Sequence, residues 1–367
     1  MVNRVSSSGR YAMLLADMQM NQYNFERLTA QLTSGSKITN ITDDPIAAVN
    51  ILNTNKQLGQ IETFETNVAM ASSELAALDD LLSLSTGYLS QAWDRAVQAN
   101  NQTYGESSLK ALKVEIDEIT KTMVDLANSE YNDNYIFSGA NTKTLAYTID
   151  ENGDIVYNGT PHDNPDYIRQ TEVSDGVFET INTTGDKVFG YYRAAVPTGQ
   201  GVYTDENTGK RVIKTTENDA TGNPVEVYRY ENGTICADIS NLTEGAEEEV
   251  VGVMGALKQL SNSLQMVIDG DTEEGYKKMN ETLDMFSDSL NTITTEQTKF
   301  GGVANRLDMT SSTLETSNES LTTLLSEVRD IDYAEAITQW MNAQYAYQAS
   351  MQIASASMNM SLLNYIQ

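Results

Sequence analysis

The sequence has one histidine and one cysteine in 367 residues, so it offers few of the side chains on which metal and nucleophilic sites depend. A single histidine, His162, excludes an HExxH zinc site and most multi-histidine metal centres, and the turn-rich residues around it predict a surface loop. The single cysteine, Cys236, excludes an internal disulfide framework and favours a small apolar filler of a predicted strand. We therefore predict no catalytic residue and no metal ligand.

Glycine-rich binding loops are also missing, because the 23 glycines are scattered and form no phosphate loop or dinucleotide fingerprint. The segment Asp150-x-Asn152-x-Asp154 begins like a calcium-binding loop. However, Ile155 stands where that loop needs glycine, and no glutamate follows at its twelfth position. The segment is better interpreted as an acidic turn, and we expect no cofactor.

Basic residues are scarce: 23 Lys and Arg stand against 52 Asp and Glu, which gives a formal net charge of −29. This charge argues against nucleic acid and anionic membrane as partners, and it keeps the monomers soluble by mutual repulsion. No stretch reaches the roughly 18 apolar residues of a membrane-spanning helix. The apolar run Tyr11–Ala16 is too short for a secretory signal peptide. The chain is therefore expected to stay in the cytosol or to be exported without a cleaved signal.

The first third of the chain has a helical pattern. Apolar residues recur at alternating steps of three and four from Tyr11 to Leu32, from Ile61 to Ala99 and from Leu109 to Leu126. This spacing predicts helices packed as long coiled-coil-like pairs. The Asp-Asp-Pro sequence at residues 43–45 predicts the N-terminus of the second helix.

The middle of the chain has a different composition. It holds four of the five prolines, many glycines and three Asn-Gly pairs. These are turn signals, and the short runs rich in Val, Ile and Tyr between them predict strands. The insertion is large enough for a small core of its own. Two hairpins are predicted, Tyr147–Ile149 with Ile155–Tyr157, and Val225–Glu231 with Thr234–Ile239 across Asn232-Gly233.

The last third returns to helix at about Glu247, and its apolar ladder runs from Tyr276 to Val328. A local bend is expected at Gly301-Gly302. At about 1.5 Å per residue the ladder would span roughly 80 Å, which is the length of a rod. Two helical ends of matching character, separated by a β insertion, imply antiparallel pairing of the two halves of the chain.

The predicted fold class is therefore mainly α with a β-rich insertion, in which both chain ends form a long antiparallel coiled-coil-like rod that carries an outer β domain. We expect three parts. Residues 1–38 with 330–367 form a terminal helical assembly domain, residues 39–139 with 246–329 form a helical rod domain, and residues 140–245 form the outer β-rich domain.

The last 38 residues contain no Lys, Arg or His and only three acids, Asp330, Asp332 and Glu335. A helix of this composition is poorly solvated when free, so we expect it to be buried against its N-terminal partner and against other subunits. Methionine and alanine suit such variable, close packing. The predicted assembly interface consists of Leu14, Met18, Phe25, Leu28, Leu32, Ile337, Met341, Ala346, Ala349, Met351, Ile353, Met358, Leu362 and Leu363.

Motifs at both ends carry a family resemblance. The segment Leu32-Thr33-Ser34-Gly35-Ser36-Lys37-Ile38, followed by Asp43-Asp44-Pro45, resembles the N-terminal signature of the bacterial flagellin family. The C-terminal segments Phe300–Leu307, Ser326–Ala334 and Tyr347–Met351, continuing to Leu362-Leu363, resemble the end of the same family. The two blocks of motifs occur in the order expected of the family and lie in the two helical ends of the chain. The resemblance does not extend to the β insertion.

Within that family, residues 132–139 (Asn-Asp-Asn-Tyr-Ile-Phe-Ser-Gly) resemble the member at the junction between the flagellar hook and its filament. The resemblance implies a structural, non-enzymatic subunit that is exported through the type III channel of the flagellum without a cleaved signal. It also implies the partners: a ring of like subunits, the neighbouring hook-associated junction protein, flagellin, and an export chaperone on the C-terminal helix. Nucleic acid and membrane are not among them.

Two alternatives remain open. A filament flagellin would share the same ends but polymerise alone, and an enzyme carried on a flagellin scaffold would need a carboxylate constellation in the β insertion. For the junction subunit we further expect the ends of the isolated monomer to be disordered, because a charge-free helix without partners does not offset its ordering entropy. Proteases would then trim roughly the first and last 35 residues.

Overall fold

The computed structural model describes residues 7–101, 104–150, 153–196, 199–208, 210–218, 224–230, 235–236 and 239–366. The chain divides into two compact units. The terminal unit consists of Met1–Thr66 and Ser311–Gln367, and the central unit consists of Asn67–Thr310.

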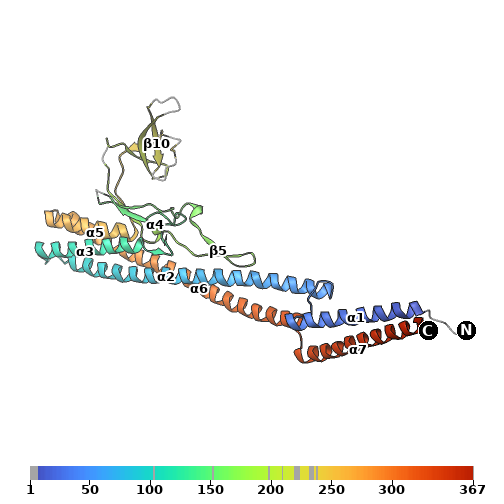
Figure 1. The fold of residues 1–367 in the computed structure, drawn as a ribbon. Coiled ribbons are helices and arrows are strands. Elements are labelled where there is room, and N and C mark those ends of the chain that lie inside the picture. The colour runs from blue at the N-terminus through green and yellow to red at the C-terminus, as the bar shows by residue number, and fades with distance from the viewer. Residues whose placement is uncertain are drawn as a thin grey trace. The chain divides into compact units, whose positions relative to one another are not determined.

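Long helices occupy both ends of the chain and strands its centre, as the sequence predicts (Figure 1). The mainly α fold with a β-rich insertion is thus confirmed. The N-terminal helices are α1 (Ser7–Ser34), α2 (Pro45–Ala99) and α3 (Glu106–Ala127). The C-terminal helices are α5 (Gly252–Asp269), α6 (Thr272–Arg329) and α7 (Tyr333–Ile366), and a short α4 (Gly185–Val188) lies between the strands.

Aspartates cap two of the long helices. Asp44 Oδ1 accepts hydrogen bonds from the backbone N–H groups of Ile46 and Ala47, both at 3.0 Å, which satisfies the free donors of the first turn of α2. Asp332 Oδ1 accepts from the N–H of Ala334 at 2.9 Å in the same way at the start of α7. The cap at Asp44 is the one that the Asp-Asp-Pro sequence predicts, and the cap at Asp332 is an additional one.

The core of the central unit lies along α2 and α6, which run antiparallel. Asn100 Nδ2 donates to Asn280 Oδ1 at 2.7 Å, and Gln297 Nε2 donates to Asp79 Oδ1 at 3.3 Å, so residue numbers rise on one helix as they fall on the other. The predicted three–four ladders supply the fully buried side chains between them, because a seam with this period stays on the facing side of both helices. They include Leu78, Leu82, Leu89, Ala92, Met279, Phe286 and Ile293.

Two four-stranded antiparallel sheets make up most of the β region. The inner sheet has the order β12-β7-β4-β3 and contacts α5, which also packs against α3. Its strands are β3 (Tyr147–Ile149), β4 (Ile155–Tyr157), β7 (Tyr191–Arg193) and β12 (Glu249–Val251). The outer sheet has the order β10-β9-β8-β11, with β8 (Val202–Asp205), β9 (Arg211–Asn218), β10 (Pro224–Tyr230) and β11 (Leu242–Glu244).

Two small hairpins complete the strands. They are β1 (Glu130–Tyr131) with β2 (Asn134–Tyr135), and β5 (Gln170–Ser174) with β6 (Val177–Thr180). A single 3₁₀ turn covers Pro165–Tyr167.

The first predicted hairpin is confirmed, since Tyr147 pairs with Tyr157 and Ile149 with Ile155. Its turn residue Asn152 lies outside the described residues. In the second hairpin the main partner of β10 is β9, with Val225 opposite Glu217, while Ile235 forms an isolated bridge with Arg229. Residues 231–234, which include the predicted Asn-Gly turn, are outside the described part of the chain.

The helix predicted from about Glu247 begins later. Residues 249–251 form β12, which pairs with β7 in the register Val250 opposite Tyr192. The β-branched pair Val250-Val251 suits a strand, and helix α5 starts only at the following glycine. The Gly301-Gly302 pair lies within α6, which is one continuous helix at that point.

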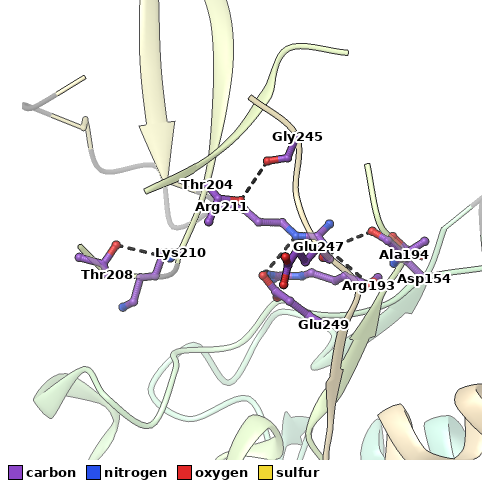
Figure 2. A network of polar contacts seen from close by, with 10 residues as sticks. All are labelled: Asp154, Arg193, Ala194, Thr204, Thr208, Lys210, Arg211, Gly245, Glu247 and Glu249. Carbon is purple, nitrogen blue, oxygen red and sulfur yellow. Dashed lines mark hydrogen bonds and ion pairs between the residues drawn. The ribbon is translucent and has the colours of Figure 1, made fainter. Parts of the chain in front are cut away.

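A buried arginine joins the outer sheet to the inner sheet (Figure 2). Arg211 of β9 donates through Nη2 to the carbonyl oxygens of Ala194 at 2.9 Å and Glu247 at 2.8 Å. Its Nε donates to Glu249 Oε1 at 3.2 Å, while Arg193 binds the other oxygen of the same carboxylate at 3.3 Å. Because only 5% of the Arg211 side chain is exposed, this cation is paired out of water, and its loss leaves several acceptors without a donor.

We predict that Arg211→Met loosens the outer sheet selectively. Hydrogen exchange should speed up about 100-fold in β8 to β11, corresponding to about 3 kcal/mol for a broken buried pair, with little change in α2 and α3. The matched control is Lys214→Met on the same strand, because its partner Glu226 is 59% exposed and a pair open to solvent on one side contributes less than a buried one. Equal exchange in the two variants would show that Arg211 does not hold the outer sheet.

Candidate assembly surface of the terminal helices

The terminal unit is built on an antiparallel pair, α1 and α7, which lie side by side (Figure 1). The ring of Phe25 stands 5.7 Å from Trp340 and 5.9 Å from Tyr347, measured between ring centroids. Trp340 Nε1 also donates to Thr29 Oγ1 at 2.9 Å. One aromatic residue of α1 thus sits between two that are two turns apart on α7, which fixes the register of the pair.

The face of α7 that meets α1 follows its own three–four ladder. Ala336 is buried, and the residues that continue the ladder are half-buried. None of them is among the predicted interface residues. The signal that could have found them is the same period that revealed the other ladders, here carried by Ala336, Trp340, Ala343, Tyr347, Ser350 and Ala354.

The predicted interface residues of α7 lie on its other sides and are exposed. Ile337, Met341, Met351 and Ile353 expose between 43% and 55% of their surface, and Ala346 and Ala349 are also exposed. The exposed residue Tyr345, which the sequence reasoning missed, belongs to the same surface. The side chains of Met358, Leu362 and Leu363 lie outside the described residues. We call the exposed apolar residues of α7 between Ile337 and Ile353 the outer face.

On α1 the predicted residues point the opposite way, into the pair. Leu28 is buried, and Leu14, Met18, Phe25 and Leu32 are half-buried. Other apolar residues of α1 remain exposed, namely Met13, Leu15, Met20 and Tyr23. The pair therefore buries one stripe of each helix and leaves apolar side chains of both in water, which is the pattern of a helix that has further partners.

Backbone contacts join the turn after α1 to the turn before α7. Lys37 N donates to Arg329 O at 2.6 Å, and Ile331 N donates to Gly35 O at 3.1 Å. Gly35 has φ +70°, a backbone conformation that residues with a Cβ rarely adopt, so the backbone of this turn favours glycine. The break after α1 and the break before α7 thus lie side by side and are joined by backbone hydrogen bonds, and we call this place the joint.

The loop of this joint is organised by Asp43. Its Oδ2 accepts from the N–H of Asn40 at 2.9 Å and from both the N–H and the hydroxyl of Thr39, at 3.1 and 3.0 Å. These hydrogen bonds, led by that from Asn40, lower the pKa of Asp43 below its ordinary value of 3.8. The first aspartate of the Asp-Asp-Pro sequence therefore folds the loop, and only the second caps the helix.

The single histidine and the single cysteine lie apart from any cluster of metal-ligating side chains in the described residues. His162 is exposed and its Nδ1 contacts Asp186 Oδ2 at 2.8 Å, and Cys236 is buried. Across the described ranges, no group of three or more His, Cys, Asp or Glu side chains is placed to hold a metal ion. No helix in the described part of the chain is both long and apolar enough to cross a membrane.

Comparison with known families matches both ends of the chain. The family model of the bacterial flagellin N-terminal helical region matches residues 5–142, and that of the C-terminal helical region matches residues 283–366. The chain belongs to the bacterial flagellin family. In this flagellin-family chain the N-terminal match includes α1 and the C-terminal match includes α7. Both helices of the terminal pair therefore lie in regions that the family models cover.

Relatives of this flagellin-family chain carry two names. Flagellar hook-associated protein 3 of Salmonella typhimurium is 24% identical over 284 residues, covering 77% of this chain and 86% of the relative. Flagellar hook-associated protein 3 of Escherichia coli is 21% identical over 360 residues and covers 98% of both. A flagellin of Clostridium tyrobutyricum is 21% identical over 354 residues, covering 89% and 91%. The resemblance seen in the sequence, to the family and within it to hook-associated protein 3, is confirmed.

A solved structure is similar in fold. The crystal structure of flagellar hook-associated protein 3 from Legionella pneumophila covers 76% of this flagellin-family chain and 98% of its own, with a TM-score of 0.55 at 18% identity. At this identity the likeness concerns the fold alone.

The Asp43 loop gives a pH prediction. Because the folded pKa of Asp43 is lowered, its contribution to loop stability is fully present above the unfolded value and is lost as the pH falls through the folded value, that is below 3.8. The Asn40 amide proton followed by NMR should titrate with a midpoint below 3.8, and Asp43→Asn should abolish that titration. Asp44→Asn, which removes only the helix cap, should leave it in place. A midpoint at or above the ordinary value would contradict this assignment.

Proposed function

We propose that this chain is a structural subunit of the bacterial flagellum that forms the junction between hook and filament. The observation that carries the proposal is the outer face of α7. This helix already packs against α1, yet it exposes Ile337, Met341 and Ile353 on sides that α1 does not reach. Exposed apolar side chains that recur along a helix already packed on one side are typical of sites of protein–protein interaction.

The junction is favoured over other positions by the relatives. Hook-associated protein 3 of E. coli aligns over nearly the whole of both chains, and the Salmonella protein of the same name also aligns over most of its length. Both names describe a protein associated with the hook. A subunit that joins unlike neighbours needs heterologous, head-to-tail contacts, and a helix that is apolar on several sides supplies more than one contact surface.

In this proposal the residues of the predicted assembly interface belong to two different surfaces. Leu14, Met18, Phe25, Leu28 and Leu32 hold α1 to α7 within one subunit. The residues of the outer face, with Met358, Leu362 and Leu363 as further candidates, contact neighbouring subunits. The division into a terminal assembly domain, a helical rod domain and an outer β-rich domain, with the predicted boundaries, is part of the same proposal.

The partners and location follow from this role. Like subunits would form a ring. The partners of this ring would be the neighbouring hook-associated junction protein and flagellin. We propose export through the flagellar channel without a cleaved signal, with a chaperone covering α7 before assembly, because a helix with no charged residue from Ala336 to Ile366 exposes apolar surface when unpaired. The role needs no enzymatic step.

Deletion of the gene in the source bacterium tests the function. Cells without the protein should assemble a hook, fail to retain a filament and release flagellin monomer into the medium. Motility should return with the intact gene on a plasmid. Filaments that remain attached in the deletion strain would refute the junction role.

The outer face is tested by complementation of the same strain. Met341→Asp with Ile353→Asp should abolish filament retention, because two charges would be buried without partners in the assembled ring. The purified variant should keep the unfolding temperature of the parent within about 2 °C, since both positions are exposed in the single chain. Val114→Asp, at an exposed apolar position of α3 in the central unit, is the matched control and should complement. Full complementation by the double variant would exclude the outer face as an interface.

A filament flagellin is the second candidate, and the similarity to the Clostridium flagellin supports it. It predicts that the purified chain polymerises alone into long filaments and is the most abundant protein of sheared flagella. A junction subunit should do neither, so electron microscopy of the purified chain separates the two.

A further inference from the structure

Helices α2 and α6 pack less closely in the terminal unit than in the central unit. In the central unit many of their facing side chains have no exposed surface, among them Leu78, Leu82, Met279 and Phe286. The terminal unit contains residues 45–66 of α2 and 311–329 of α6. In these two segments no apolar side chain is less than 6% exposed, and the most buried are Ala48, Ile61, Leu314 and Leu325.

An open groove follows the seam between these two segments. It has a volume of about 450 Å³, and its lining includes Ile61 and Phe64 of α2 and Leu321 of α6. Asn318 of α6 donates through Nδ2 to Glu65 Oε1 of α2 at 3.4 Å, so a long polar contact also lies in the seam. A helix pair with few fully buried apolar contacts has a small free energy of local opening.

The closely packed part of the pair begins where the β5–β6 hairpin contacts both helices. On the α2 side, Asn67 Nδ2 donates to the carbonyl oxygen of Glu172 in β5 at 2.8 Å. Arg169, next to the start of β5, forms an ion pair with Glu74 of α2, and only 16% of the Glu74 side chain is exposed. Since Asn67 is the first residue of the central unit, β5 holds α2 at the edge of that unit.

On the α6 side the contact is a bidentate ion pair. Arg306 Nε donates to Glu179 Oε1 of β6 at 2.7 Å, and Arg306 Nη2 donates to the second oxygen of the same carboxylate. Only 13% of the Glu179 side chain is exposed, so loss of this partner leaves a largely buried charge. Because Glu179 of β6 pairs with Thr171 of β5, the hairpin connects α2 to α6 through two ion pairs.

The base of the hairpin is fixed farther into the central unit. Lys187 Nζ, on α4 after the hairpin, pairs with Glu296 Oε1 of α6 at 2.6 Å, and the Thr183 hydroxyl donates to Glu296 Oε2 at 3.2 Å. The side chain of Glu296 is only 5% exposed. Loss of the Arg306 contact would therefore release the end of the hairpin near its turn, while the base stays attached to α6.

We propose that the β5–β6 hairpin is a strap that confines the opening of the α2–α6 pair to the terminal unit. Residues 45–66 and 311–329 separate reversibly, and the opening ends at Asn67 and Arg306. Arg306 belongs to the segment Phe300–Leu307, so the strap gives a physical role to a residue of the family motif. This inference does not rest on the junction role.

Hydrogen exchange of the full chain under native conditions, resolved by mass spectrometry of peptides, locates the boundary of opening. In the parent, residues 45–66 and 311–329 should exchange at least about tenfold faster than residues 75–99 and 279–293. Arg306→Met removes the closing contact of the strap. Exchange of residues 67–74 and 300–310 should then speed up about fivefold, the upper end for a partly exposed pair, while residues 279–293 keep the parent rate.

Three results would overturn the strap. They are a parent chain without a boundary, an Arg306→Met variant whose boundary is unmoved, and a variant in which exchange accelerates throughout the central unit, because that would be a general loss of stability. The matched control is Lys110→Met. Lys110 pairs with Glu106 at 2.6 Å on the exposed surface of α3 in the same unit, so this variant should leave exchange in α2 and α6 unchanged.

Charge reversal tests the closing contact itself. Glu179→Arg should move the boundary in the same direction as Arg306→Met, because two cations would then face each other. Addition of Arg306→Glu should move it back to its place in the parent, since the pair is restored with the opposite polarity. A boundary that stays displaced in the double variant would show that the ion pair between these two residues does not close the strap.

Discussion

The terminal unit depends on one constraint: α7 carries no charged side chain after Glu335, and in the described part of the chain its extensive helix packing is with α1. Pairing with α1 buries the stripe that contains Trp340 and Tyr347 and leaves the outer face in water. An intramolecular pair of two helices has no third element to cover that face. The proposed association with other subunits would remove it from water, and completion of the fold and assembly would then be one process, as in coupled folding and binding.

The distribution of charge fits the same account. Residues 67–310 hold 40 of the 52 acidic and 17 of the 23 basic residues, so most of the net charge lies outside the terminal unit. Electrostatic repulsion between chains then acts mainly on their central units and less on the helices proposed to associate. The joint at Gly35 and Ile331 fixes where α1 and α7 begin their pairing, and the hydrogen bonds that Asp43 accepts from Thr39 and Asn40 hold the adjoining loop.

Periodicity predicted much of this fold, because a seam of period three and four leaves a clear trace in sequence. The ladders of α2 and α6 were accessible in this way, while capping and turn residues predicted the Asp44 cap and the hairpin from Tyr147 to Tyr157. The inner stripe of α7 was missed although it has the same period, because apolar residues such as Ile337, Met341 and Ile353 on the other sides of the helix give a competing signal. Contacts across long stretches of sequence were also beyond reach, such as Arg211 with Glu249 and the pairing of β12 with β7. These depend on side chains that have no periodic signature.

Accessibility of single cysteines tests the central claim most directly. In a Cys236→Ala background, Ala343→Cys would place a thiol on the inner stripe of α7 and Ile353→Cys would place one on its outer face. Each is treated with a maleimide in the free chain and in intact flagella. The account predicts that Ile353→Cys reacts in the free chain and that both positions are protected in the flagellum. Protection of Ala343→Cys together with full reaction of Ile353→Cys in the flagellum would contradict it.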